Sequence, residues 1–275
     1  RRAKISSYMM FGWPLGFGAT VLISHFLSPI FGWPVLYFLG ATAIFLAIYI
    51  QVAIPESPMW MKMQADKKQG ISAGAPVVSV GFGDLLKKEH IRAFFWVVVI
   101  CSSLMVTYWS VNTFLPTVLA KERGLSPKAY SSFLMFLQLT ACVGYLMGGF
   151  LAHKMGKRAT MAVFSFLASV TFYVWLAFEW SDNLFFLWGS LNWTVASAIW
   201  AILAAYLVEQ FPTNIRAVGV AGGFSTGRLI ATVVPLVLGA TAVQLGLIAV
   251  MTFVSIFYLL CMVGVLMLRD SVKHL

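Results

Sequence analysis

Residues 93–116 read AFFWVVVICSSLMVTYWSVNTFLP and contain no charged side chain. About 20 apolar residues in a helix are enough to cross the hydrocarbon core of a bilayer, so this stretch predicts a transmembrane helix. Seven further apolar runs of similar length lie before and after it. The eight predicted spans cover residues 6–27, 33–54, 93–116, 131–152, 159–178, 184–208, 217–240 and 244–268.

The composition of the whole chain agrees with a membrane protein. Of its 275 residues, 60% are hydrophobic and 10% are charged, whereas a soluble domain carries about 25% charged residues. A transmembrane β-barrel requires segments of about ten residues with alternating polarity, and the runs found here are longer and apolar on every face. We therefore predict an all-α integral membrane protein. Its three cysteines, Cys101, Cys142 and Cys261, lie in apolar runs and are expected to be buried.

The basic residues are distributed unequally between the two sides of the predicted bundle. Short connections make successive spans antiparallel, so the segments between spans alternate between the two sides of the membrane. Fifteen of the 19 lysines and arginines fall on the side that holds Arg1; the exceptions are Lys121, Arg123, Lys128 and the intramembrane Arg228. Because cytoplasmic loops carry the excess of Lys and Arg, we expect a multi-pass protein of the plasma or inner membrane with both termini in the cytoplasm.

Residues 55–92 form one long polar connection, which divides the spans into groups of two and six. Gly, Pro, Ser and Lys dominate the middle of this segment, as is typical of a linker between bundles. The predicted domains are a helix pair in residues 1–54, a cytoplasmic central loop in residues 55–92 and a six-helix bundle in residues 93–275.

Three motifs occur at the predicted cytoplasmic ends of the spans. They are PESPMW at residues 55–60, GFLAHKMGKR at 149–158 and EQFPTNIR at 209–216. In this order they resemble the major facilitator superfamily, in which Pro-Glu-Ser-Pro-Arg-Trp closes the sixth helix and Gly-x-x-x-Asp-Arg-x-Gly-Arg-Arg is a loop motif. This chain differs in having Met59 in place of the usual arginine and His153 in place of the aspartate.

The resemblance covers the whole chain and implies a helical bundle of the major facilitator type. The eight spans would correspond to helices five to twelve of a twelve-helix transporter, and the last six would form two inverted three-helix repeats. Residues 108–116 and 216–229 are most similar to the organic-anion/proton symporters of the aromatic-acid and sialate branches. The sugar-porter branch shares the Pro-Glu-Ser-Pro element and is the close alternative.

The motif residues at the predicted cytoplasmic face are candidates for gating. Basic side chains there are expected to bridge to carboxylates and to the C-terminal ends of helices, which would hold the inner side closed during alternating access. Alternatively, the basic residues only set the topology, and His153 weakens the gating hypothesis because it removes a carboxylate. The candidate gating residues are Glu56, Gly149, His153, Lys154, Gly156, Lys157, Arg158, Glu209 and Arg216.

Arg228 is the one charged residue inside a predicted span. It lies near the expected midplane, where a guanidinium has to face a cavity or a partner. A bidentate contact with a substrate carboxylate would satisfy it; a structural partner in another helix is the alternative. The small residues Gly219, Gly222, Gly223 and Gly227 precede it at spacings of three and four and predict close contact with another helix.

Polar and aromatic residues in other spans extend the candidate site. Tyr108 and Asn112 are four residues apart and therefore share one helix face. Alternatively, the polar residues form hydrogen bonds between helices, and the aromatic residues lie at the membrane interface. The candidate substrate-binding residues are Arg228, Tyr108, Asn112, Gln138, Asn192 and Trp193.

These features predict a secondary active transporter of a small organic anion, coupled to protons, and not an enzyme. The four histidines are scattered along the chain, so no catalytic residue, metal site or cofactor is expected. The expected partners are a small carboxylate substrate, protons and the lipid bilayer, with no nucleic acid and a monomeric chain. A sugar or polyol porter, or a receptor that binds without transport, is the alternative. Because Arg228 cannot exchange a proton at ordinary pH, the proton-carrying carboxylate is expected in helices that precede this sequence, with His25 as a distant alternative.

Overall fold

The computed structural model describes residues 12–56, 61, 65 and 81–268, and every regular element in this part of the chain is helical. The helices, in chain order, are α2 (Gly12–Phe31), α3 (Val35–Ala41), α4 (Ala43–Ala53), η1 (Phe82–Leu86), α6 (Ile91–Thr117), η2 (Val118–Glu122), α7 (Pro127–Met155), α8 (Lys157–Ala177), α9 (Asp182–Leu207), η3 (Val208–Gln210), α10 (Arg216–Leu245), α11 (Leu247–Phe253) and α12 (Ser255–Met267). The predicted all-α membrane fold is confirmed.

The eight predicted apolar runs coincide with these helices. Seven helical stretches of the described chain are long and apolar enough to cross a membrane, and the described part of the first run contributes a shorter apolar helix, Gly12–Ser24. Two runs are divided, at Thr42 between α3 and α4 and at Val254 between α11 and α12. The turn after α10 falls at Gly246 and not at residues 241–243, because its φ of 82° favours glycine.

Contacts divide the chain into two units, and their boundary falls within α2. The larger unit contains the described residues of Arg1–Val21 and Gly81–Leu275, and the smaller one those of Leu22–Val80. In the smaller unit, α3 and α4 together make up one candidate membrane span, which exposes large apolar side chains and buries none, as a membrane-spanning helix does. The predicted domains, residues 1–54, 55–92 and 93–275, stay a prediction.

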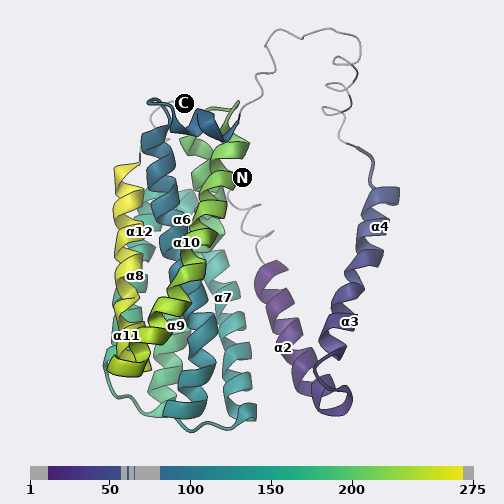
Figure 1. Cartoon of the computed structure of the whole chain (residues 1–275), viewed down its shortest axis with the longest axis vertical. Helices are drawn as coiled ribbons and strands as arrows, with labels where there is room; N and C mark the ends of the chain where they lie inside the picture. The colour runs from purple at the N-terminus through teal and green to yellow at the C-terminus, as the bar shows by residue number, and fades with distance from the viewer. Residues whose placement is uncertain (1–11, 57–60, 62–64, 66–80, 269–275) are drawn as a thin grey trace. The chain divides into compact units, whose positions relative to one another are not determined.

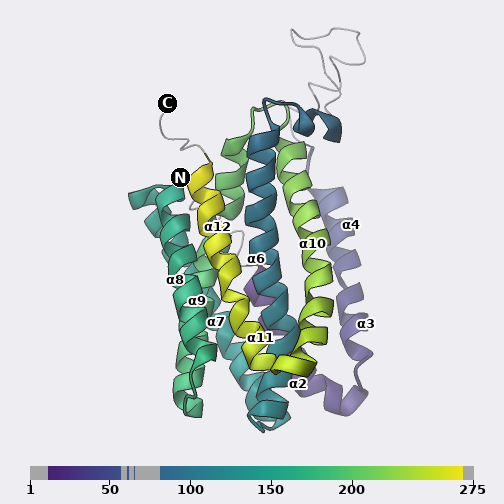
Figure 2. The ribbon, with the colours of Figure 1, turned by 60° about the vertical axis from the view of Figure 1, so that its left-hand side comes forward.

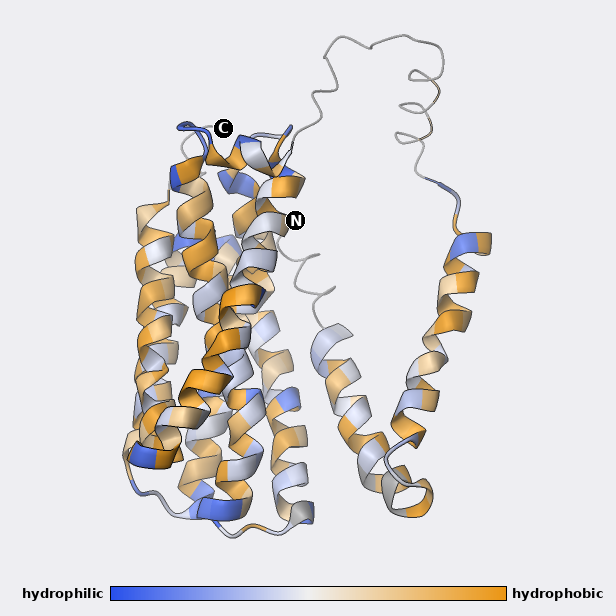
Figure 3. Ribbon diagram, in the orientation of Figure 1, coloured by the Kyte–Doolittle hydropathy of each residue, from blue (hydrophilic) through white to orange (hydrophobic). Residues whose placement is uncertain are grey.

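The larger unit is a helical bundle in which two groups of helices meet (Figures 1 and 2). In one group α9 packs against α7 and α8, and in the other α6 packs against α10 and α12; α12 also contacts α8 and so joins the groups. Trp175, Phe172 and Tyr206 are among the largest fully buried side chains of this core. Figure 3 shows that hydrophilic residues gather toward the ends of these helices.

Two glycines allow α7 to approach α9 more closely than any other residue would. A Cβ atom at Gly144 would lie 2.1 Å from the carbonyl oxygen of Thr194, and one at Gly148 would lie 2.4 Å from that of Ala198. Such distances are far below van der Waals contact, so a side chain at either position would force the helices apart. Small residues four apart are typical of this kind of packing between membrane helices.

Candidate substrate-binding site

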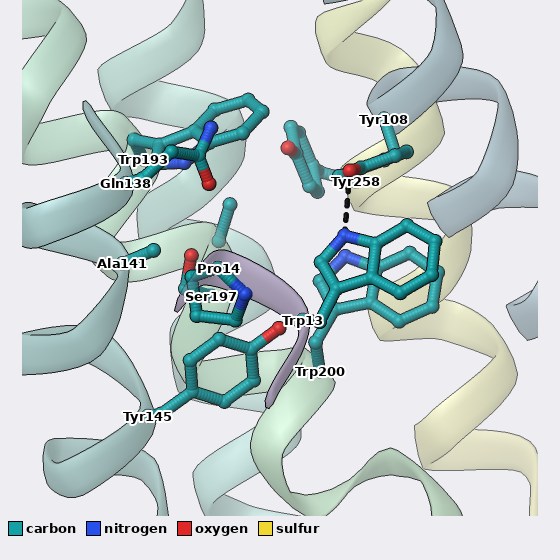
Figure 4. Close-up of a pocket in the computed structure, with 11 residues that line it drawn as sticks. Trp13, Pro14, Tyr108, Gln138, Ala141, Tyr145, Trp193, Ser197, Trp200 and Tyr258 are labelled. Carbon is teal, nitrogen blue, oxygen red and sulfur yellow. Dashed lines mark hydrogen bonds between the residues drawn. The ribbon is translucent and has the colours of Figure 1, made fainter. Parts of the chain in front are cut away.

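Two adjoining cavities lie among the helices of the larger unit. The first, which we call the aromatic cavity, has a volume of about 20 Å³ (Figure 4). The second, the central cavity, has a volume of about 250 Å³. Trp13, Tyr108, Tyr145 and Trp200 line both cavities, so the two meet at these side chains. A mostly aromatic and apolar cavity with few polar groups is the usual form of a small-molecule site; of these two, the central cavity has the room for a small molecule, and the aromatic cavity extends it by the volume of about one water.

The linings of the two cavities differ in chemistry. Uncharged polar groups join the aromatic rings in the first, and a guanidinium joins them in the second. The aromatic cavity is lined by Trp13, Pro14, Tyr108, Gln138, Ala141, Tyr145, Trp193, Ala196, Ser197, Trp200 and Tyr258. The central cavity is lined by Trp13, Met105, Tyr108, Trp109, Tyr145, Trp200, Leu203, Ala204, Phe224 and Arg228.

Tyr108 on α6 lies at the centre of the aromatic residues. Its ring is stacked on that of Trp193, with centroids 5.9 Å apart and planes at 28°, and it meets Trp200 edge-on at 5.7 Å. The indole Nε1–H of Trp13 on α2 donates to Tyr108 Oη over 2.8 Å, as Figure 4 shows. Aromatic pairs of this geometry stabilise one another, so the Tyr108 hydroxyl is held where the two cavities meet.

Arg228 reaches the central cavity because α10 packs closely on α6. A Cβ atom at Gly223 would lie 2.4 Å from Val97 Cγ1, and one at Gly227 would lie 2.9 Å from Cys101 Cβ. The close contact predicted from the glycine spacing is therefore confirmed. Arg228 directly follows this glycine stripe on α10 and is exposed beside the contact.

The guanidinium of Arg228 has no carboxylate partner among the described residues, in which the ion pairs lie elsewhere. It also lines an open groove of about 610 Å³, together with Trp109, Thr113 and Thr232. A guanidinium binds a carboxylate in a bidentate manner, and neighbouring aromatic rings stack on a planar group. The site therefore has the chemistry to hold a planar carboxylate.

The structure brings four of the six predicted binding residues to these cavities: Arg228, Tyr108, Gln138 and Trp193. Their contact with a substrate stays a prediction. Asn112 instead donates through Nδ2 to the backbone carbonyl of Tyr108, one turn earlier in α6, over 2.7 Å. Asn112 is absent from the linings of both cavities, and its contact with a substrate also stays a prediction.

Asn192 lies outside the linings of both cavities. Its side chain is fully buried, and Nδ2 donates to the carbonyl oxygen of Ala168 and to Thr171 Oγ1, each over 3.0 Å. Both acceptors belong to α8, so Asn192 joins α9 to α8. Its contact with a substrate stays a prediction.

Sequence reasoning missed several residues that line the cavities. Tyr145 follows Gln138 by seven positions, and Trp200 follows Trp193 by seven, which is two helical turns and therefore the same face. This spacing would have identified both. Trp13 gives no such signal, because its partner Tyr108 lies 95 positions away on another helix.

The motif residues 149–158 lie where α7 ends and α8 begins, and we call this the basic end of the bundle. Gly149 is buried in α7. Gly156 joins the two helices with a φ of 84°, which favours glycine. Lys157 Nζ forms an ion pair with Glu209, in the short helix η3 that follows α9. The predicted bridge from the basic loop to Glu209 is present.

Arg158 interacts with a different helix at the basic end. It donates from Nε to the carbonyl oxygen of Val265 over 3.3 Å and from Nη2 to that of Leu266, at the C-terminus of α12. Carbonyl groups at a helix C-terminus carry partial negative charge and favour a cation. Arg216, at the start of α10, donates from Nε to the carbonyl oxygen of Phe211 over 3.3 Å.

The remaining gating candidates do not take part in these interactions. Lys154 Nζ lies 4.6 Å from the centre of the Phe150 ring, and His153 is exposed. Glu56 is exposed and belongs to the smaller unit. The rest of its motif, residues 57–60, lies outside the described residues. The bridges expected of the basic residues are therefore observed for Lys157, with Glu209, and for Arg158, with the C-terminus of α12; their part in gating stays a prediction.

Comparison with known proteins identifies the family. The family model described as Major Facilitator Superfamily matches this chain in two overlapping stretches, residues 1–195 and 105–274. The chain belongs to the major facilitator superfamily. The resemblance drawn from the motifs is thus confirmed, and the superfamily accounts for the helical membrane bundle.

Several transporters are similar to this superfamily member. The cis,cis-muconate transport protein of Acinetobacter baylyi is 26% identical over 243 residues, which are 88% of this chain and 58% of that protein. The niacin transporter NiaP of the same organism is 27% identical over 250 residues, 82% and 55% of the two chains. The sialic acid transporter NanX of Escherichia coli is 23% identical over 222 residues, 79% and 51%. The chain spans little more than half the length of these relatives.

Proposed function

We propose that this chain carries the substrate-binding cavity of a secondary active transporter that moves a small organic anion, a carboxylate, across the membrane. The main support is Arg228, a guanidinium that lines the central cavity without an ion-pair partner among the described residues. An unpaired cation within a membrane span is costly unless a ligand or partner neutralises it. The relatives named for cis,cis-muconate, niacin and sialic acid add support, because all three compounds are carboxylic acids.

Alternating access would close the site from one side at a time, and the basic end supplies contacts for the inner gate. The Lys157–Glu209 pair joins α8 to the end of α9, and Arg158 joins α8 to the end of α12. We place this end in the cytoplasm because of its excess of basic residues. Proton coupling is part of the proposal, and Arg228 stays charged throughout, so another group carries the proton.

A sugar or polyol porter is the alternative within the superfamily. The uncharged lining of the aromatic cavity has the chemistry for it, since Gln138 offers an amide and the Trp193 ring offers a flat face, but a sugar would have to occupy the larger central cavity as well. Recognition of an uncharged solute would not depend on a guanidinium. A receptor that only binds would take up ligand without exchanging it across the membrane.

The test is uptake and counterflow of labelled niacin, cis,cis-muconate, sialic acid and glucose by the protein expressed from its complete gene. Arg228→Ala should lower carboxylate uptake about 10- to 100-fold, because hydrogen bonds to a charged group contribute about 1.5–3 kcal/mol. Arg228→Lys keeps the charge but loses the planar fork, and should also weaken uptake strongly. Leu236→Ala, at an exposed position of α10 that lines neither the groove nor the two cavities, is the matched control.

Each alternative has its own result. Normal carboxylate uptake by the Arg228→Ala variant would contradict the proposal. Glucose uptake that does not depend on Arg228 would favour a sugar porter, and binding without counterflow would favour a receptor. The amount of each variant in the membrane, measured by immunoblot, separates loss of function from loss of protein.

A further inference from the structure

We infer that Trp13 is a positioning residue that makes Tyr108 a hydrogen-bond donor to the substrate, at the end opposite its carboxylate. This inference rests on the proposed function and narrows its substrate class. The substrate would be a carboxylate with a planar unsaturated body that carries a hydrogen-bond acceptor.

The first step is the position of Trp13. It comes from α2, whereas the other residues at the junction of the two cavities come from α6, α7 and α9. Its ring meets that of Tyr108 edge-on, with centroids 6.3 Å apart. Its Nε1 lies 2.8 Å from Tyr108 Oη, and Figure 4 shows this bond at the edge of the aromatic cavity. Trp13 therefore fixes the hydroxyl of Tyr108 from across the site.

The second step is the direction of that hydrogen bond. An indole N–H only donates, so Tyr108 Oη must be the acceptor. A phenol has a single proton, which remains to be donated elsewhere. A hydroxyl that accepts one hydrogen bond becomes a better donor in the next, because the bonds polarise each other. Trp13 thus prepares Tyr108 to donate to an acceptor in the cavity.

The third step is the separation of charges along the site. Arg228 supplies the positive charge of the central cavity, while Gln138 and Ser197 supply uncharged polar groups in the aromatic cavity, and Tyr108 lines both. Trp109 and Trp200 add aromatic rings to the lining of the central cavity. A carboxylate at Arg228 and a neutral acceptor at Tyr108 would match both ends.

Niacin and benzoate form a pair of probes that isolates the acceptor. Both are planar aromatic carboxylates of nearly the same shape, and niacin has a ring nitrogen where benzoate has a C–H group. The dissociation constants of both are measured by calorimetry on the protein from its complete gene, reconstituted in nanodiscs. The wild type should bind niacin more tightly than benzoate.

Three variants then test whether Tyr108 and Trp13 cause the preference for niacin over benzoate. Tyr108→Phe removes the donor and should weaken niacin binding about 3- to 10-fold, the usual effect of one neutral hydrogen bond, with less than a twofold change for benzoate. Trp13→Phe keeps an aromatic ring but loses the N–H group, and should reduce the same preference by a smaller factor. In the Tyr108→Phe background, Trp13→Phe should cause no further loss of preference, because it acts through Tyr108.

The matched control is Trp188→Phe, the same substitution at a tryptophan outside both cavities. The ring of Trp188 lies against that of Trp180, with centroids 5.9 Å apart. This variant should prefer niacin over benzoate as strongly as the wild type does. Equal losses for niacin and benzoate in Trp13→Phe and Tyr108→Phe would overturn the inference and leave the proposed function intact. A wild type that binds neither probe nor any other carboxylate would overturn both. Melting temperatures confirm that each variant is folded, and Tyr108→Phe tests the donor even if Trp13→Phe does not fold.

Discussion

Helices α9 and α10 follow one another in the chain and are similar in length and hydropathy, yet they occupy different environments. In the most apolar stretch of α9, 67% of the residues are buried, compared with 6% in α10. α9 lies between α7 and α8, whereas α10 packs on α6 through a glycine stripe and exposes its other faces. Hydropathy therefore identifies a membrane helix but does not tell a central helix from a peripheral one. The pattern of small and polar residues carries that information.

The largest contrast should come from adding one methyl group at a glycine that faces α9 closely and at a glycine of α10 that lies outside its close contact with α6. Gly144→Ala would place a Cβ atom 2.1 Å from the Thr194 carbonyl oxygen of α9. We expect a loss of roughly 5 kcal/mol, above the usual 1–3 kcal/mol for overpacking, because backbone atoms must move. Little folded protein should be recovered in size-exclusion chromatography.

The control for that change is on α10. Gly239→Ala would place its Cβ atom 4.0 Å from Phe114 Cζ, which is ordinary contact. It should be neutral or stabilise the protein by about 0.5–1 kcal/mol, since alanine favours a helix over glycine. Equal behaviour of the two variants would mean that α7 and α9 are not packed as closely as the structure places them.

Substitution of one leucine by alanine in each helix should give the next largest difference in the free energy of unfolding. Leu203 on α9 is 1% exposed and Leu236 on α10 is 73% exposed. Leu203→Ala leaves a cavity and should lower the free energy of unfolding by about 2–5 kcal/mol. Leu236→Ala should change it by less than about 0.5 kcal/mol, as surface substitutions usually do. Thermal unfolding in the same detergent measures both, and a large loss for Leu236→Ala would show that α10 is covered as α9 is.

The comparison also shows what the sequence could predict. The spans could be predicted because the length of an apolar run is a local property, and Arg228 because a charge inside such a run is visible without a structure. The role of Asn192 could not, because the sequence does not show that it faces Thr171 on α8 and not the cavity. Trp13 was missed for the same reason: its importance comes from a contact with Tyr108, 95 positions away.

Substitution of a polar residue in α9 and in α10 should give a smaller difference in the free energy of unfolding. Asn192→Leu on α9 removes both hydrogen bonds to α8, while the Thr171 hydroxyl keeps its bonds to the carbonyls of Leu167 and Ala168. We expect a loss of about 1–3 kcal/mol, because each of the two hydrogen bonds contributes about 0.5–1.5 kcal/mol. Thr232→Val on α10 removes only a bond to the carbonyl of Arg228 within its own helix, and should cost less than about 0.5 kcal/mol. If Asn192→Leu lost substrate binding and kept full stability, Asn192 would belong to the substrate site and not to the contact between α9 and α8.

The smallest effect is expected where α9 ends, at the ion pair between Lys157 and Glu209. Both side chains are partly exposed, at 23% and 31%, and pairs of this kind contribute about 0–1 kcal/mol because water screens them. Lys157→Gln and Glu209→Gln should each lower the free energy of unfolding by no more than that, and the double variant should lose no more than either single one. If the pair belongs to an inner gate, its effect will appear in function instead: both single variants should change the rate of substrate exchange more than they change stability. Counterflow rates and melting temperatures for the four proteins separate the two roles. Unchanged counterflow in both single variants would leave the pair a structural contact between α8 and the end of α9, with no part in gating.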